Sequence, residues 1–413
     1  MRTWTAAMVL LVLISLASGV FAQGPFYVSC NTPVRYADPT IRLNFDTGDM
    51  SAAYTKQAAD QLVLNAIAYW NNAPGTTIHI VRGDDLANDV TVANYKNLVF
   101  PRSGGDSKHP SLYDGLTPVI YDSDGQIIDD FLGAGSSNYT IGFATSIFFT
   151  DSSNFIPGSG YVIIHDNTTA FGETSITLQN AIAHEIGHLI GLDHSQAGTS
   201  LCNSPHDDSY PLMYPIANCR ASANLHVDDE ASVAALYPAA DVTSSFGEIS
   251  GRLTNHSDKS PIKGANIFLL DASGDINISY SGVTDYLKQN TGNFKIYAKP
   301  GTYTLHSTKI DSGFTNSNRI GPYAAPNQNV PVVDFISGTP ITITAGSAVH
   351  VSLSSDGSGT ISYNHAMEFT QNTTCSDPSD GATTGSMSWM LLLCLLLALS
   401  NRIYMGLQPR QIS

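Results

Sequence analysis

Residues 184–194 read HEIGHLIGLDH, a stretch that contains three histidines and one glutamate. Side chains four residues apart on a helix leave the same face one turn apart, so His184 and His188 can bind one Zn²⁺ together. Glu185 points along the open side of the metal, where it can take a proton from water. His194 follows as the third nitrogen ligand. Three nitrogen ligands leave one position for water, which is typical of a catalytic rather than a structural zinc site.

Two further observations favour a genuine site over histidines placed by chance. Gly191 allows the chain to leave the helix with a positive φ and to return His194 to the metal. In a chain with this composition, the fixed positions of the motif would match by chance with a probability of roughly one in a hundred thousand. A protein that keeps the metal only for structure is the alternative, but the presence of Glu185 argues against it. We expect a helix over residues 174–189 that carries the site.

The composition narrows the class of protein. The 413 residues include 35 acidic and 19 basic side chains, for a formal charge of −16, which argues against a basic nucleic-acid binder. Only 13% of residues are charged, and Gly, Ser, Thr and Asn are frequent, so strands and long loops are favoured over an all-helical bundle. The length and the 42% of hydrophobic residues indicate about two domains with real cores.

The N-terminal half alternates strand and helix patterns. Thr40–Phe45 alternates apolar and polar residues like a strand, and residues 52–70 carry apolar side chains at helical spacing. Further strand-like segments are residues 76–81, 90–92, 141–150 and 161–164, of which the last two are expected at sheet edges. Residues 100–138 are rich in loop residues. This order predicts a mixed α/β domain.

The sequence around the motif resembles the metzincins, and among them the matrixins, the matrix metalloproteinase group. Ser195 follows the third histidine as in matrixins, and Pro211-Leu212-Met213-Tyr214-Pro215 is similar to their Met-turn. The spacing of the matrixin C-terminal helix is kept by Leu225, Asp228, Asp229, Leu236 and Tyr237. The resemblance covers about residues 35–238. It implies an α+β catalytic domain with a mixed twisted sheet and long helices, one catalytic zinc and peptide-bond hydrolysis of protein or peptide substrates.

The resemblance also implies roles for the Met-turn residues. Met213 would form the hydrophobic base under the zinc, and Tyr214 with Pro215 would help to wall the primed-side specificity pocket. The His-, Asp- and Gly-rich loop that holds structural zinc and calcium in matrixins is not evident, because residues 141–167 offer only His165 and Asp166. A second zinc is therefore not expected.

A calcium site and a disulfide are further candidates. Asp122 and Asp124 stand in a DSDG sequence that matches half of an EF-hand loop, so either a tight Asp-Gly turn or a calcium site of another kind is open. Cys202 and Cys219 bracket one loop, and an oxidising compartment would favour a disulfide between them. Cys30 has three readings: a disulfide, a free thiol, or a thiolate that occupies the open zinc position.

The chain divides into segments of different composition. Residues 1–22 read as a cleaved signal peptide, and residues 388–400 as an apolar sorting or membrane-anchor segment. Between them we expect a catalytic domain over 23–238, a linker over 239–245, an all-β sandwich over 246–354 and a flexible Ser/Thr/Gly-rich stalk over 355–387, with a polar tail over 401–413. These ends predict an exported protein, secreted or attached to the cell surface through membrane or sorting machinery.

The expected sandwich has strand-like segments at residues 248–253, 265–270, 292–298, 301–307 and 341–353. Residues 247–253 and 292–305 resemble carboxypeptidase-regulatory-like domains, which implies either a spacer or a module that binds a surface polymer or substrate. For the whole chain the prediction is an exported zinc-dependent endopeptidase. The alternative is an inactive surface adhesion or scaffold protein stabilised by metal. A deacetylase or other zinc amidohydrolase is disfavoured, because three histidines with a Met-turn belong to the peptidase pattern.

Overall fold

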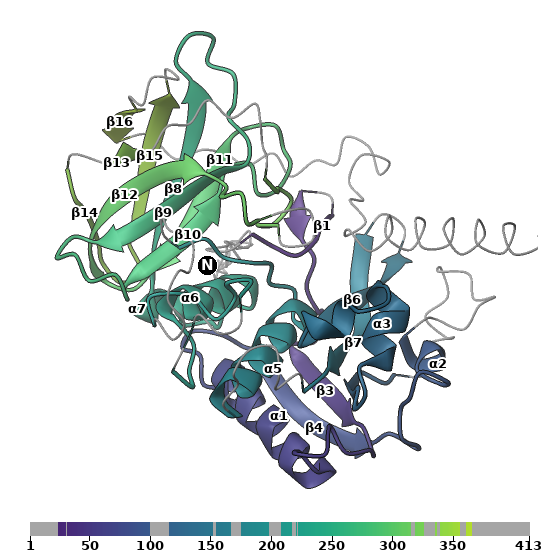
Figure 1. Ribbon diagram of the computed structural model, residues 1–413. Coiled ribbons are helices and arrows are strands. Elements are labelled where there is room, and N and C mark those ends of the chain that lie inside the picture. Colours follow the sequence, from purple (N-terminus) through teal and green to yellow (C-terminus); the bar gives the residue numbers. More distant parts are fainter. Residues whose placement is uncertain are drawn as a thin grey trace, which may run out of the picture.

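The computed structural model shows an N-terminal and a C-terminal part, each built around β-sheets (Figure 1). The residues described are 24–29, 31–99, 115–151, 154–166, 175–197, 208–216, 220, 222–314, 319–325, 335–336, 339–355 and 361–365. In Figure 1 the N-terminal part runs from purple to teal and the C-terminal part from green to yellow. Helices α6 (Val227–Leu236) and α7 (Val242–Ser245) lie between the two.

A five-stranded mixed sheet forms the centre of the N-terminal part. Its strands, in order across the sheet, are β4 (His79–Asp85), β3 (Thr40–Phe45), β5 (Pro118–Tyr121), β7 (Asn154–Ile164) and β6 (Gly142–Asp151). Neighbours pair in parallel except β6, which runs antiparallel to β7. The expected mixed α/β domain is confirmed. The prediction of an edge strand at residues 161–164 is wrong. These residues belong to β7, which pairs with β6 on one side and with β5 on the other.

Helices cover both faces of this sheet, and alternate side chains of one strand enter different cores. Val119 and Tyr121 of β5 join the core that contains α1 (Lys56–Asn71) and α5 (Ser175–Leu189). Ile120 joins the opposite core, with α2 (Lys96–Val99) and α3 (Gln126–Leu132). The indole N–H of Trp70, near the end of α1, donates to the carbonyl of Ala183 in α5 at 2.9 Å. The helix that carries the zinc motif is thereby held between the sheet and α1.

The short elements complete this part of the chain. They are β1 (Val28–Ser29), β2 (Thr32–Pro33), α2 (Lys96–Val99), α3 (Gln126–Leu132) and the 3₁₀ turn η2 (Ser136–Asn138).

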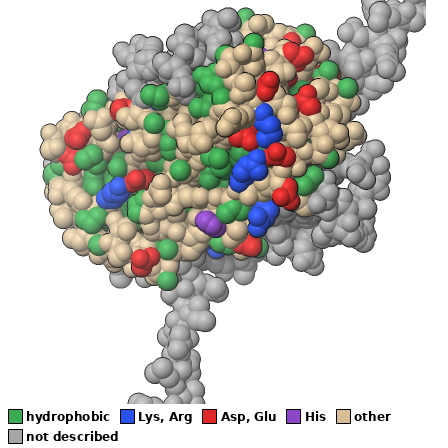
Figure 2. All heavy atoms as spheres, turned by 90° about the horizontal axis from the view of Figure 1, so that it is seen from below, with side chains coloured by type: hydrophobic (Ala, Val, Ile, Leu, Met, Phe, Trp, Pro, Cys, Tyr) green, Lys and Arg blue, Asp and Glu red, His purple; other side chains and the backbone are tan. Residues whose placement is uncertain are grey.

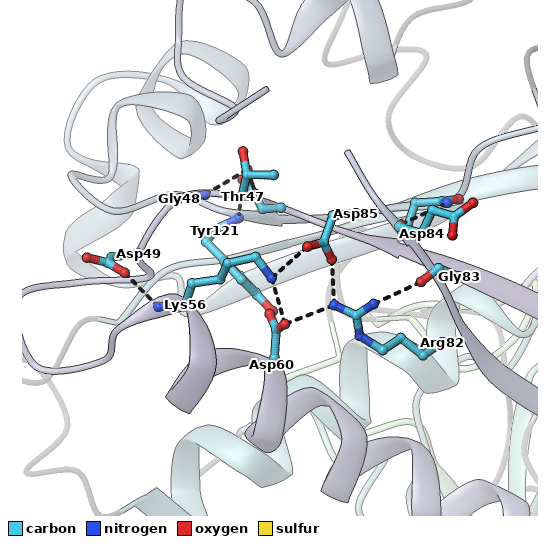
Figure 3. A network of polar contacts seen from close by, with 12 residues as sticks. Thr47, Gly48, Asp49, Lys56, Asp60, Arg82, Gly83, Asp84, Asp85 and Tyr121 are labelled. Carbon is cyan, nitrogen blue, oxygen red and sulfur yellow. Dashed lines mark hydrogen bonds and ion pairs between the residues drawn. The ribbon is translucent and has the colours of Figure 1, made fainter. Parts of the chain in front are cut away.

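A network of charged side chains ties the start of α1 to β4 (Figure 3). Asp60 accepts from Lys56 at 2.7 Å, from Arg82 at 3.1 Å and, through its other oxygen, from the Tyr121 hydroxyl at 2.9 Å. Lys56 and Arg82 also pair with Asp85, at 3.2 and 2.5 Å. Because these groups are partly exposed, each pair contributes about 1 kcal/mol or less. The network positions α1 without belonging to the metal centre.

Within the central sheet of the N-terminal part, one predicted strand is absent, and β5 was not predicted. Residues 90–92 do not form a strand, because the Val90 N–H donates to the Asp46 carboxylate at 3.0 Å instead of to a neighbouring strand. Val90 is nevertheless buried, which explains its apolar character. Pro118–Tyr121 forms β5 in the middle of a segment that was expected to be loop.

The C-terminal part contains two sheets that share one hydrophobic core. In the first sheet, β9 (Ala265–Asp271) pairs with β10 (Ser279–Val283) and β12 (Gly301–Lys309), and β12 also pairs with β13 (Phe335–Ile336) and β14 (Ile341–Ile343). The second has the order β11 (Asn293–Ala298), β8 (Gly247–Asn255), β15 (Ala348–Ser355), β16 (Ile361–His365). Ala231 and Ala234 of α6 also enter this core. The two parts of the chain therefore meet at α6.

The strand β16 lies within the stretch predicted to be a flexible stalk, so that prediction is wrong for residues 361–365. Their backbone continues the sheet beyond β15 in antiparallel register, a pairing that the surrounding Ser- and Gly-rich sequence did not indicate. The predicted signal peptide and apolar tail lie outside the described residues. Among the described residues, no helix is long and apolar enough to cross a membrane. On the face shown in Figure 2, Lys and Arg side chains stand beside Asp and Glu side chains rather than in a basic patch.

Candidate metal centre

The three predicted histidine ligands converge in the structure. His184 and His188 leave α5 one turn apart, and α5 ends before Gly191, whose φ is +102°. The Leu192 N–H donates to the Gly187 carbonyl at 3.0 Å, and the chain turns back to bring His194 to the helix. One ligand atom from each histidine lies within 4.8 Å of the others, and His188 Nε2 and His194 Nε2 are 3.2 Å apart. Among the residues the structure describes, no other group of metal-ligating side chains meets in this way.

The second nitrogen of each imidazole is held by a backbone carbonyl. His184 Nδ1 lies 2.8 Å from the Leu212 oxygen, His188 Nδ1 lies 2.8 Å from the Leu192 oxygen, and His194 Nδ1 lies 3.2 Å from the Arg319 oxygen. A carbonyl only accepts, so each Nδ1 carries the proton and each Nε2 keeps its lone pair for a metal.

Burial keeps the two helix histidines neutral. It lowers the pKa of His184 to about 3, with His194 as a second cause, and it holds the pKa of His188 well below its usual value. Neutral imidazoles with converging lone pairs are the donor set that zinc prefers. The residues present therefore fit a zinc ion.

Glu185 lies beside the histidines as a buried carboxyl group. It is 9% exposed, and its Oε2 atom has no hydrogen-bond partner among the described residues. Burial raises the pKa of Glu185 to about 8, against the opposing effect of the Ala144 backbone N–H. A nearby cation lowers such a pKa again. A carboxyl group with a free oxygen and a raised pKa is suited to exchange a proton with water at neutral pH.

Met213, from the predicted Met-turn, lies against α5. Met213 is fully buried, and a Cβ atom on Gly187 would stand 2.3 Å from its sulfur. Glycine at position 187 thus lets Met213 press against α5 between the two histidines, a requirement that the sequence analysis missed. Tyr214 is buried and packs edge-on against Phe314, with ring centroids 5.7 Å apart, whereas Pro215 is half-buried.

Two aspartates of α6 form hydrogen bonds with the segments next to the histidines. The Asp229 carboxylate accepts from the backbone N–H groups of Leu212, Met213 and His226 at 2.7, 3.1 and 2.9 Å. The Leu212 carbonyl in turn accepts from His184 Nδ1. Asp229 therefore helps to position His184 indirectly, through the backbone of Leu212.

Asp228 connects the loop that carries His194 to the C-terminal part. Its carboxylate accepts from the Ser195 hydroxyl, next to the third histidine, and from the Ser281 N–H at 2.7 Å. Burial, followed by the charge of Asp229, raises the pKa of Asp228 to about 7. The sequence spacing had singled out both aspartates, but not these contacts.

The predicted calcium ligands Asp122 and Asp124 each accept hydrogen bonds from the residues that follow them. The Asp122 carboxylate accepts from the N–H groups of Ile127 and Ile128 at 3.1 and 2.8 Å and so satisfies the start of α3. Asp124 is exposed and accepts from Gln126. These contacts match the tight-turn alternative, and a calcium site stays a prediction. Cys30, Cys202 and Cys219 lie outside the described residues, so the disulfide stays a prediction too.

Comparison with known proteins gives one match that covers much of the chain. The model of the matrixin family matches residues 32–238, which is half of the 413 residues. No curated protein matches.

Solved structures match only weakly. The major pilin subunit BcpA of Bacillus cereus is 20% identical over 28% of this chain and 31% of that one, with a TM-score of 0.18. A DUF3823 family protein from Parabacteroides merdae is 17% identical over 27% and 46%, with a TM-score of 0.16. A 9R-lipoxygenase from Cyanothece is 20% identical over 28% and 17%, with a TM-score of 0.17. The match spans less than half of each of these chains.

Proposed function

The chain belongs to the matrixin family, and we propose that it is a zinc-dependent endopeptidase that hydrolyses peptide bonds of proteins with Glu185 as the general base. The observation that carries the proposal is the convergence of three histidines beside a buried carboxyl group, whose Oε2 atom has no hydrogen-bond partner among the described residues. A structural zinc site would instead be closed by a fourth protein ligand. The described residues offer three.

His184, His188 and His194 would hold the zinc through Nε2. When bound, zinc supplies Lewis acidity, which polarises a peptide carbonyl and lowers the pKa of water. Glu185 takes a proton from the attacking water at its free Oε2 and passes it to the nitrogen of the leaving amine.

An extended peptide has a place to bind beside the centre. The sheet order ends at β6, and within the described residues no strand pairs with its outer side. β6 packs on α5, and Gly142 at its start is close to Glu185, since a Cβ atom there would lie 3.3 Å from the Glu185 side chain. A substrate paired along this edge would present a backbone carbonyl to the histidines.

The remaining parts of the proposal rest on the sequence. Residues 1–22 and 388–400 support export and attachment at the cell surface. The two C-terminal sheets would form the β-sandwich domain, as a spacer or as a module that binds a surface polymer.

Chelation tests the enzymatic function against the alternative of an inactive adhesion protein. We expect the purified chain to cleave an unfolded protein, to lose this activity with a zinc chelator and to regain it when zinc is added back. An adhesion protein would bind zinc without cleaving, so a zinc-loaded chain that leaves several unfolded substrates intact would reject the proposal.

A further inference from the structure

The third histidine differs from the other two in the origin of its hydrogen-bond acceptor. The acceptors for His184 and His188 are carbonyls of residues 212 and 192, inside the stretch that matches the matrixin model. The acceptor for His194 is the carbonyl of Arg319, which lies 125 residues further along the chain, between β12 and β13. One of the three contacts that orient the ligands is thus made by the C-terminal part.

The Arg319 side chain fixes the position of that carbonyl. Its Nε donates to Asp193 Oδ2 at 3.1 Å, and its terminal nitrogen donates to the Phe26 carbonyl at 2.8 Å. Asp193 is 1% exposed, and its other oxygen accepts from the His194 N–H at 2.9 Å. Arg319 therefore holds His194 twice, through its own carbonyl and through Asp193.

The N-terminal segment forms the other side of this arrangement. The guanidinium of Arg319 lies 5.6 Å from the centre of the Phe26 ring, and this ring lies 5.2 Å from the His188 ring. The Phe26 N–H donates to the Gly191 carbonyl at 2.9 Å. The segment at residues 24–28 therefore lies between Arg319 and the end of α5, with contacts to both.

Contacts on both sides of Arg319 anchor its segment. The Asp311 N–H donates to Gln196 Oε1 at 2.9 Å, and Gln196 Nε2 donates to the Lys309 carbonyl at 3.2 Å. Beyond Arg319, the Tyr323 hydroxyl donates to Asp285 in the C-terminal part at 2.8 Å. The C-terminal part thus presents the Arg319 carbonyl from a segment that is tied down before and after it.

We propose that Arg319 is a positioning residue of the metal centre, which orients His194 for zinc and makes the C-terminal part a component of the site. The physical reason is that His194 stands on a loop beyond the end of α5, where no helix fixes its ring. Hydrogen bonds to the outer nitrogen of a metal-binding histidine set its ring orientation, and their loss typically weakens metal binding about 10- to 100-fold. The proposal rests on the zinc site of the proposed function, but not on hydrolysis.

The test measures zinc affinity by competition with a chromogenic chelator, in full-length chains that also carry Glu185→Ala to prevent self-cleavage. Arg319→Ala removes both side-chain bonds, and we expect zinc binding at least about tenfold weaker. Arg319→Lys can keep the pair with Asp193 but not the second donor to Phe26. Its zinc affinity should therefore lie between that of the protein with Arg319 and that of Arg319→Ala. The matched control is Arg252→Ala, since Arg252 is a half-buried arginine that binds Asn293 in the C-terminal sheets and should not affect zinc.

A spectroscopic measurement separates positioning from a merely structural anchor. In Co²⁺-substituted protein, displacement of His194 changes the visible absorption bands, whereas loss of a remote anchor lowers only the unfolding temperature. We expect altered bands in Arg319→Ala and partial recovery in Arg319→Lys. Unchanged zinc affinity and unchanged bands in folded Arg319→Ala would overturn the proposal. If that variant does not fold, a wild-type affinity and spectrum in Arg319→Lys would do so. A wild-type chain that binds zinc but cleaves nothing would reject the proposed function alone.

Discussion

Replacement of Asp229 should destabilise the N-terminal part more than replacement of any exposed aspartate. The Asp229 side chain is fully buried and accepts from the N–H groups of Leu212, Met213 and His226. Asp229→Ala leaves these donors without their acceptor in a site that is closed to water. A hydrogen bond to a charged group contributes about 1.5 kcal/mol or more, so the three together give a loss of about 4 to 5 kcal/mol.

Asp229→Asn should cost less, because its shape is conserved. One carboxylate oxygen accepts from Leu212 and His226, and the other accepts from Met213. The amide oxygen can keep the first two bonds, but the amide N–H₂ then faces the Met213 N–H. The expected loss is about 1.5 to 3 kcal/mol.

Thermal unfolding of the zinc-loaded proteins measures the difference. For a unit of this size, 1 kcal/mol shifts the midpoint by about 2 to 4 °C, so Asp229→Ala should unfold about 8 to 20 °C below wild type and Asp229→Asn about 3 to 12 °C below. Asp38→Ala is the control, because Asp38 is exposed and, within the described part of the chain, accepts only the local Thr40 N–H. A wild-type midpoint in Asp229→Ala would refute the role assigned to this carboxylate, as would an equal loss in Asp38→Ala.

Two further predictions concern the same support. Burial raises the folded-state pKa of Asp228 to about 7, above its unfolded value of about 3.9, so the folded protein binds this proton more tightly and loses the corresponding stability as pH rises from about 4 to 7. Asp228→Asn should therefore gain stability relative to wild type over that range, and a constant difference in urea midpoints across it would contradict the assignment. Gly187→Ala would place a Cβ atom 2.3 Å from the Met213 sulfur and 2.9 Å from the Trp70 ring, with an expected loss of about 1 to 3 kcal/mol in urea unfolding. An unchanged urea midpoint would show that Met213 can move aside freely.

The local parts of the site could be predicted from the sequence because helix geometry determines them. A four-residue spacing on a helix places His184 and His188 together, and a glycine after the helix returns His194 to them. The helix itself was expected at residues 174–189 and is observed at Ser175–Leu189. Such patterns depend only on neighbouring residues, so no knowledge of the tertiary structure was needed.

The contacts that join distant segments could not be predicted in this way. Arg319 contacts Asp193 and Phe26, which lie 126 and 293 residues before it, and no local pattern marks an arginine as their partner. The strand prediction at Val90 was wrong for a related reason. An apolar side chain indicates burial, but it does not indicate that the backbone N–H donates to Asp46 rather than to a neighbouring strand. β5 is only four residues long, and its pairing with β3 and β7 depends on segments before and after it in the chain.

The most direct test of the account is the zinc content and cleavage rate of Glu185→Ala, measured on the same preparation. In the proposed function the three histidines hold the metal and Glu185 transfers the proton, so the variant should retain one zinc per chain while cleavage of an unfolded protein falls by about 10² to 10⁴. Glu248→Ala, which removes a carboxylate paired with Lys295 in the C-terminal sheets, should keep both zinc and activity. A Glu185→Ala protein that binds zinc and cleaves at the wild-type rate would contradict the account.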